Sequence, residues 1–150
     1  SEMLIMGASR AQLVAQELTP VLRRGGVVVC DRFADSTTVY QGYARGLDLD
    51  FIARLHEQCV GGRWPDLTIY LDLDVQVGIE RSRKRFAPRA STDRFEKESL
   101  EFHESVRRGF QELAKQHPER IQTVDAAQPT EAIHTKIMEL VDDAIERLQS

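Results

Sequence analysis

The sequence predicts an α/β protein in which helices cover a parallel sheet. Three short apolar runs, at 26–30, 67–72 and 121–125, lack polar alternation, which is typical of strands buried on both faces. Stretches with helical spacing of apolar residues separate these runs. Because strands that alternate with helices build layered parallel sheets, we expect a single domain over residues 1–150. Three strands are few for such a fold.

The first half of the chain is predicted to hold one strand among helices. Pro20 should kink or restart the first helix, because proline lacks the N–H group that a helix interior uses. The predicted elements, in order, are a helix over 3–24 closed by Gly25 and Gly26, a strand over 26–30, a helix over 36–45 with Gly42 and Gly46 marking its frayed end, and a helix over 49–59.

The second half should add two strands and three helices. Asp74 is placed to cap the helix that follows the strand at 67–72. Asp93 and Glu96 have the spacing of an N-cap and a third helical residue, which favours a capping role for both. The other elements, in order, are a helix from 75 into the basic run 81–85, a mobile loop over 86–92, a long helix over 93–115, a strand over 121–125 and a helix over 131–148.

Composition excludes several classes of protein. The formal net charge of −4 argues against a general nucleic-acid binder, which usually carries a basic surplus. Cys30 and Cys59 lack metal-ligand spacing and Cys30 lies in a predicted strand, which favours reduced thiols and a cytoplasmic protein. No apolar run approaches the ~20 residues of a membrane span, and no secretion signal is visible at the N-terminus. The four histidines are scattered and are assigned no chemistry.

The end of the first predicted strand carries an acid and a guanidinium, Asp31 and Arg32. Ligands of open α/β sheets collect beyond the carboxyl ends of the strands, so this pair suits metal and phosphate. Arg32 can clamp a phosphate with two N–H groups, and Asp31 can hold Mg²⁺ directly or through water. A surface ion pair is the alternative. Arg10 on the first helix can reach the same cleft, although taken alone it is better interpreted as solvent-exposed.

Two further regions are candidates for ligand contacts. Tyr40 and Gln41 follow Asp31 by about two helical turns, and a tyrosine there either packs on a sugar or fills the core. Arginines flank the predicted loop over 86–92, where they either form solvated surface or supply charge for phosphoryl transfer. Nucleic-acid binding is a weaker third interpretation, because few aromatic side chains interleave with these arginines.

Taken together, several segments closely resemble bacterial thymidylate kinase, from about Met3 through Leu148. The segments that carry the resemblance are Ala8-Ser9-Arg10-Ala11-Gln12, Asp31-Arg32-Phe33, Ser36-Thr37, Tyr40-Gln41-Gly42, Arg45-Gly46, residues 64–72 and Asp93-Arg94-Phe95-Glu96. The resemblance implies a three-layer nucleoside monophosphate kinase fold with a parallel sheet. It also implies Mg²⁺-dependent transfer of a phosphoryl group from ATP to dTMP, and a homodimer formed through helix packing, with no nucleic-acid or membrane partner.

The resemblance also implies roles for individual residues. Arg32 would hold the acceptor phosphate, and Asp31 would lie near the metal. The acceptor nucleotide would be bound by Met6, Arg10, Arg32, Thr37, Tyr40 and Gln41, with Arg10 and Thr37 at the thymine edge and Tyr40 against the deoxyribose. The loop over 83–92 would be a lid whose arginines, Arg83, Arg85 and Arg89, act with Arg32 on the transferring phosphoryl group. Arg81 and the backbone of Ala126 and Ala127 would lie near the adenine.

The chain departs from the family pattern at two points. Met6 stands where the family usually has an aromatic residue that stacks on thymine, and a thioether packs on a ring less strongly. No Gly-x-x-x-x-Gly-Lys-Ser/Thr phosphate loop is present in the sequence. In the family the strand before that loop lies between the counterparts of the strands at 27–30 and 67–71. We therefore expect these 150 residues to be a C-terminal portion that is inactive alone, with a missing segment of roughly 50 residues or more.

Two alternatives to a dTMP kinase remain. The chain can be a binding module that keeps the acceptor cleft without catalysing transfer. It can also belong to a kinase of the same fold that acts on another nucleoside or nucleotide.

Overall fold

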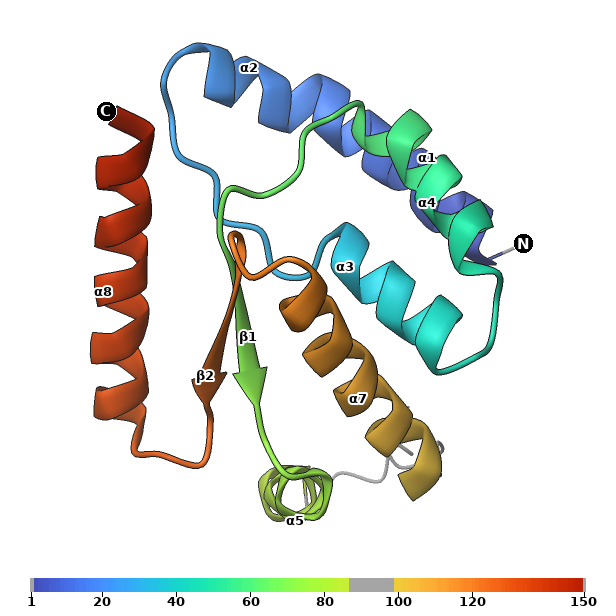
Figure 1. Cartoon of the computed structure of the whole chain (residues 1–150), viewed down its shortest axis with the longest axis vertical. Helices are drawn as coiled ribbons and strands as arrows, with labels where there is room; N and C mark the ends of the chain where they lie inside the picture. The colour runs from blue at the N-terminus through green and yellow to red at the C-terminus, as the bar shows by residue number, and fades with distance from the viewer. Residues whose placement is uncertain (1, 87–98, 150) are drawn as a thin grey trace. The chain divides into compact units, whose positions relative to one another are not determined.

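In the computed structural model of the chain, residues 2–86 and 99–149 are described, except for the side chains at 85 and 86 (Figure 1). The chain divides into two compact units, Ser1–Trp64 and Pro65–Ser150. The expectation of a single domain therefore stays a prediction. Among the described residues, no helix combines the length and the apolar character that crossing a membrane requires.

The described part of the first unit is helical. Its elements are α1 (Glu2–Leu13), the π-helix η1 (Val14–Leu18), α2 (Thr19–Arg23), α3 (Ala34–Thr37), the π-helix η2 (Thr38–Tyr43) and α4 (Leu49–Val60). Pro20 lies in the first turn of α2, but α1, η1 and α2 follow one another without a break, and Leu18 and Thr19 keep right-handed helical angles. The helix therefore does not restart at Pro20, and the wider turn of η1, which directly precedes the proline, is the local distortion of the helix there.

Glycines end the helical segments of this unit where the chain must turn. Gly25 follows α2 with a φ of 74°, a left-handed conformation that glycine adopts without a steric penalty, as the sequence predicts. Gly42, predicted to mark a frayed end, is instead buried within η2. Leu49 packs so closely against it that a side chain at this position would collide with the leucine, which explains the glycine. The segment ends at Gly46, whose φ is 72°.

The core of the first unit forms where α1 and η1 meet the later helices. A buried cluster combines Val14 with Phe33, Ala34 and Val60, and Leu18 packs against it. Gly7 lets α1 approach α4 closely, because a Cβ there would lie 3.1 Å from the Cys59 sulfur. The same approach places the next turn of α1, which carries Arg10, over the start of α3.

The predicted strand over 26–30 is wrong. These residues form no strand, and Val27 and Val29 are 75% and 95% exposed, with Cys30 also exposed. A β-strand is defined by the neighbour that accepts its backbone hydrogen bonds, and among the described residues none pairs with this run. Apolar, β-branched composition alone was therefore insufficient to specify a strand.

The second unit contains a two-stranded parallel sheet, formed by β1 (Thr68–Asp72) and β2 (Ile121–Asp125), as predicted. Thr68 pairs with Ile121 and Asp72 with Asp125, so both strands end in an aspartate at the same edge. In Figure 1 the helices α7 (Leu100–Gln116) and α8 (Thr130–Gln149) lie on opposite sides of this pair of strands. β2 buries Ile121 and Val124 and exposes Thr123 and Asp125, whereas no residue of β1 is fully buried and Leu71 is 48% exposed.

Two helices of this unit begin at side-chain caps. Asp74 accepts hydrogen bonds from the backbone N–H groups of Gln76 and Val77 at the start of α5 (Val75–Phe86), which confirms the predicted cap. The long helix predicted over 93–115 begins at Leu100 instead, because the extended residue Ser99 is its N-cap and accepts from the Phe102 N–H. The predicted capping residues Asp93 and Glu96 lie outside the described residues.

Candidate functional site

The predicted site residues that the structure describes fall into two clusters, one in each unit. In the first unit, Arg10 connects α1 to the start of α3. Its Nη2 donates to the Phe33 carbonyl oxygen at 3.3 Å and to Thr37 Oγ1 at 3.0 Å, and its guanidinium carbon lies 5.4 Å from the centre of the Phe33 ring. The structure therefore brings Arg10 and Thr37 together. The solvent-exposed interpretation of Arg10 is wrong, because these contacts half-bury its side chain.

One nitrogen of Arg10 lacks a partner. Nη1 is buried, and within the described part of the chain it has no hydrogen-bond acceptor. Burial lowers the pKa of Arg10 from its ordinary value, although a guanidinium remains charged at neutral pH. A buried donor without an acceptor costs free energy, so an acceptor oxygen that reached this nitrogen would be bound favourably.

Arg32 and Tyr40 form a second contact of this unit. The guanidinium carbon of Arg32 lies 4.5 Å from the centre of the Tyr40 ring, within the range of a cation–π interaction. Arg32 Nε also donates a long hydrogen bond of 3.5 Å to Ser36 Oγ. Arg32 has a φ of 64° and is the only described residue other than glycine with a positive φ. Non-glycine residues held in this region often mark functional sites.

A buried histidine, which the sequence analysis assigned no chemistry, lies behind this cluster. His56 on α4 is 2% exposed, and its Nε2 lies 3.2 Å from Thr38 Oγ1 on η2. Burial, followed by the nearby charge of Arg10, lowers the pKa of His56 from 6.5 to about 4, while Asp35 and the Ala34 backbone oppose this shift. His56 is therefore neutral at physiological pH and couples α4 to the helix that carries Tyr40 and Gln41.

The lowered pKa of His56 predicts an acid-sensitive fold. Between pH 6.5 and 4 the unfolded chain binds a proton at this residue and the folded chain does not, so stability falls as pH falls. We expect wild type to lose about 3 kcal/mol more unfolding free energy than His56→Gln between pH 7 and pH 4 in urea titrations. His134→Gln, at an exposed position on α8, is the matched control, and its unfolding free energy should change between pH 7 and pH 4 as that of wild type does. Equal pH slopes for wild type and His56→Gln would contradict the assignment.

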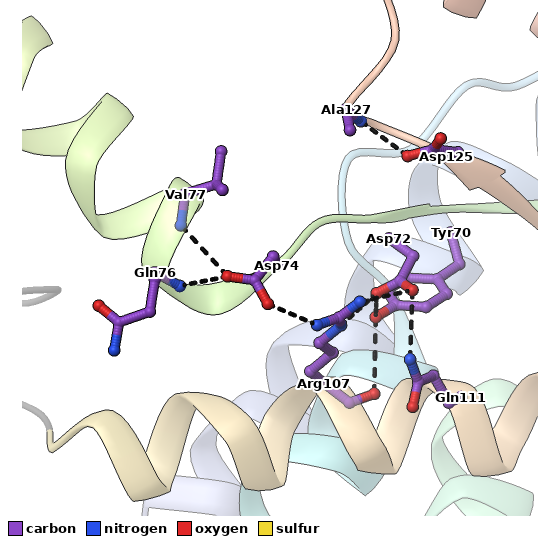
Figure 2. A network of polar contacts seen from close by, with 9 residues as sticks. All are labelled: Tyr70, Asp72, Asp74, Gln76, Val77, Arg107, Gln111, Asp125 and Ala127. Carbon is purple, nitrogen blue, oxygen red and sulfur yellow. Dashed lines mark hydrogen bonds and ion pairs between the residues drawn. The ribbon is translucent and has the colours of Figure 1, made fainter.

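The second cluster lies at the carboxyl end of β1 and is drawn in Figure 2. Arg107 on α7 donates to Asp72 through Nε at 2.7 Å and through Nη2 at 3.2 Å, and to Asp74 through Nη1 at 3.2 Å. Gln111, one turn later, donates to Asp72 Oδ2, and the Tyr70 hydroxyl donates to Asp72 Oδ1. One guanidinium thus ties the end of β1 to the N-cap of α5.

The pKa shifts of this cluster have a common origin. Hydrogen bonds from Arg107, and then from Tyr70 and Gln111, lower the pKa of Asp72 against the opposing effect of burial. The same bond to Asp72 raises the pKa of Arg107. Burial, with the hydrogen bond to Asp72, raises the pKa of Tyr70. Both oxygens of Asp72 therefore accept hydrogen bonds from protein side chains. These bonds account for the lowered pKa of Asp72 without a bound metal ion.

Arg81 of α5 reaches the end of the neighbouring strand. Its Nη1 donates to the Ala126 carbonyl oxygen at 3.0 Å, so the structure brings the predicted adenine-site residues Arg81 and Ala126 together. The adjacent backbone is also bonded: the Ala126 N–H donates to the Asp72 carbonyl, and the Ala127 N–H donates to Asp125 Oδ1 (Figure 2). The backbone N–H groups of Ala126 and Ala127 already have acceptors, so neither is unused as a donor for a nucleotide base at this edge.

The remaining predicted site residues differ in how much the structure describes. Met6 and Asp31 are exposed, and Gln41 is buried at 7% exposure. Arg83 is exposed on α5, and Arg85 belongs to the same helix. Arg89 and most of the proposed lid lie outside the described residues.

Asp31 offers the kind of oxygen ligand that Mg²⁺ prefers. No group of three or more histidine, cysteine, aspartate or glutamate side chains that could hold a metal occurs among the described residues. Mg²⁺ in phosphate-transfer sites keeps several waters and takes one or two carboxylates together with phosphate oxygens. The exposed carboxylate of Asp31 fits this kind of site, in which the protein supplies few ligands.

Sequence reasoning missed Arg107 and Gln111. The available signal was their spacing of four residues, which places both on one face of a helix. Val106 and Phe110 occupy the neighbouring positions and pack inward, with Phe110 stacked on Tyr70 at a ring separation of 5.0 Å. The predicted strand over 67–72 ends in Asp72, so the sequence already contained a carboxylate with which Arg107 could pair.

The two-stranded parallel sheet and the helices that flank it make this an α/β protein. This architecture is consistent with a nucleoside monophosphate kinase fold, the class to which the family match below assigns the chain. A family model described as thymidylate kinase matches residues 1–137. The chain belongs to the thymidylate kinase family, which confirms the resemblance seen in the sequence.

Curated relatives are similar over nearly the whole chain. A thymidylate kinase of a Cyanothece species is 44% identical over 97% of this chain, one of Desulfovibrio desulfuricans is 48% identical over 89%, and one of Geobacter sulfurreducens is 46% identical over 98%. The matched regions cover 62%, 63% and 70% of these three relatives. The chain thus spans less than two thirds of the length of the first two.

Proposed function

We propose that the protein transfers the γ-phosphoryl group of ATP to dTMP, giving dTDP and ADP. Membership of the thymidylate kinase family and the names of the similar relatives support this activity. The first unit would bind the acceptor nucleotide, and the second would bind ATP. We also propose that the protein is cytoplasmic and that it acts as a homodimer.

The buried Nη1 of Arg10 is the observation that carries the acceptor assignment. It is a desolvated donor beside Thr37, and a carbonyl oxygen of a pyrimidine base would satisfy it. Met6, about one helical turn before Arg10 on the same helix, would pack against the base through its thioether. Gln41 would contribute from η2 to the same acceptor site.

Arg32 would hold the acceptor phosphate with its terminal N–H groups, since a guanidinium binds phosphate oxygens bidentately. Asp31 would hold Mg²⁺ next to it, with waters and phosphate oxygens as further ligands. When bound, Mg²⁺ neutralises charge on the phosphate oxygens. Arg32 orients the acceptor oxygen toward the phosphorus that it attacks.

On the ATP side, Arg81 would lie against the adenine while it stays bonded to the Ala126 carbonyl. Because the N–H groups of Ala126 and Ala127 already have acceptors, the base would be held more by stacking than by these donors. Arg83, Arg85 and Arg89 would supply positive charge to the transferring phosphoryl group.

A coupled assay of ADP release tests the proposed function. With Mg²⁺-ATP and the full-length protein, we expect dTMP to be the preferred acceptor, with kcat/KM about tenfold or more above that for dUMP, since one buried methyl group gives this discrimination. dCMP and dGMP should be poorer still. Binding of dTMP without ADP release would indicate a non-catalytic nucleotide-binding module. Preference for another acceptor would indicate a different kinase of the same fold.

A further inference from the structure

Arg32 combines an unusual backbone conformation with a side chain that makes few contacts among the described residues. Its φ of 64° disfavours any residue with a Cβ, so the local structure must offset this cost. Among the described residues, two side-chain contacts can fix the guanidinium: the Tyr40 ring at 4.5 Å and the 3.5 Å bond to Ser36 Oγ. A donor–acceptor distance of 3.5 Å is long, so the aromatic ring is the stronger of the two constraints.

The contact with Tyr40 leaves the phosphate-binding groups of Arg32 available. A cation–π interaction uses the charge of the guanidinium, whereas phosphate recognition uses its N–H groups. Within the described part of the chain, neither terminal nitrogen of Arg32 has a hydrogen-bond acceptor. Arg32 can therefore rest on the Tyr40 ring and bind a phosphate at the same time.

Helical geometry explains why this pair forms. Tyr40 lies on η2, which continues directly from α3, and Ser36 lies one turn earlier on α3. Residues three to four positions apart share a helix face, so the Ser36 hydroxyl and the Tyr40 ring both face the arginine that precedes the helix. His56, bonded to Thr38 between them, ties this helix to α4.

We propose that Tyr40 is a positioning residue, which acts on the acceptor phosphate by holding the Arg32 guanidinium over its ring. This inference rests on the proposed function and deepens it. It goes beyond the expectation that Tyr40 packs against the deoxyribose, because one face of the ring already lies against Arg32. The two roles make different demands on the ligand: a positioning role requires the phosphate, whereas a sugar contact does not.

Binding of dTMP and of thymidine to the full-length protein, measured by calorimetry, separates the two roles. Tyr40→Leu removes the ring and should weaken dTMP binding roughly 3- to 30-fold, while thymidine binding stays within about twofold of wild type. Tyr40→Phe keeps the ring and should restore most of the dTMP affinity. Tyr43→Leu removes a tyrosine from the same π-helix whose ring is not the one beneath Arg32, and it is the matched control.

Equal weakening of dTMP and thymidine by Tyr40→Leu would overturn the proposal and assign Tyr40 to the sugar. No weakening of either ligand would overturn both roles. If wild type binds neither ligand, the proposed function itself fails, and this inference fails with it.

Nuclear magnetic resonance of the ligand-free protein gives a readout that does not depend on nucleotide binding. The ring current of Tyr40 should shift the Arg32 Nε–H proton upfield in wild type and in Tyr40→Phe. That shift should disappear in Tyr40→Leu and persist in Tyr43→Leu. An Arg32 resonance that is unchanged by Tyr40→Leu would overturn the proposed contact.

Discussion

Replacing Arg32 with alanine is expected to lower kcat/KM for dTMP about 100-fold or more, with most of the change in KM. Two charge-assisted hydrogen bonds to the acceptor phosphate would be lost, and each contributes about 1.5 kcal/mol or more. Steady-state kinetics of the full-length protein with varied dTMP at saturating ATP would measure this loss. The KM for ATP should change little, because the proposed function assigns Arg32 to the acceptor site.

The positive φ of Arg32 allows this functional loss to be separated from an effect on stability. Arg32→Gly removes the same side chain but suits the left-handed backbone, so it should be about 1 kcal/mol more stable than Arg32→Ala. Both variants should have the same kinetic defect. Arg23→Ala, on exposed surface of α2, is the control and should behave like wild type. Near-normal kinetics in Arg32→Gly would contradict the assignment of Arg32 to the phosphate.

Replacing Arg107 with alanine is expected to cost about 3 kcal/mol of unfolding free energy in urea titrations. The loss leaves Asp72 without its main donor and frees the N-cap residue Asp74 from α7. The side chains of Arg107 and Asp72 are 32% and 19% exposed, which places the cost at the lower end for breaking a buried pair. Arg107→Lys should lose less, because it keeps the charge without the fork of donors.

Arg108→Ala is the matched control, since Arg108 is exposed and, among the described residues, its side chain donates only to Ser105 on its own helix, so the variant should unfold like wild type. The ion pair between Arg107 and Asp72 also predicts that the stability of the fold depends on pH. The lowered pKa of Asp72 means that its stabilising contribution is present above pH ~4, the ordinary pKa of aspartate, and is lost as pH falls through the lower folded value. In Arg107→Ala this acid sensitivity should shrink. An unchanged acid transition would argue against the ion pair.

Local patterns predicted most of the helices and two of the strands. Gly25 was decisive because glycine permits a left-handed backbone conformation by itself. The run over 26–30 was misassigned because strand formation depends on a neighbour distant in sequence. The start of α7 was placed too early because the capping pattern at Asp93 drew the prediction upstream of Ser99, the residue that caps α7.

The candidate site could be predicted only in part for similar reasons. Residue type identified Arg10, Arg32 and Tyr40, because few side chains combine charge or a ring with fixed hydrogen-bond geometry. Their mutual contacts could not be predicted, since the stacking of Arg32 on Tyr40 depends on the positive φ of Arg32. Arg107 was missed because a basic residue in a helix is usually exposed, and only the fold shows that an aspartate faces it.

The two compact units are continuous in sequence, and the chain passes from one to the other once, between Trp64 and Pro65. All contacts inside the first unit therefore join residues that a ribosome has already synthesised before it adds Pro65. Packing of Gly7 against α4 and of Arg10 against Thr37 can thus begin on the nascent polypeptide. It does not require residues of the second unit, which are synthesised later. The acceptor-binding residues would be assembled in order of translation.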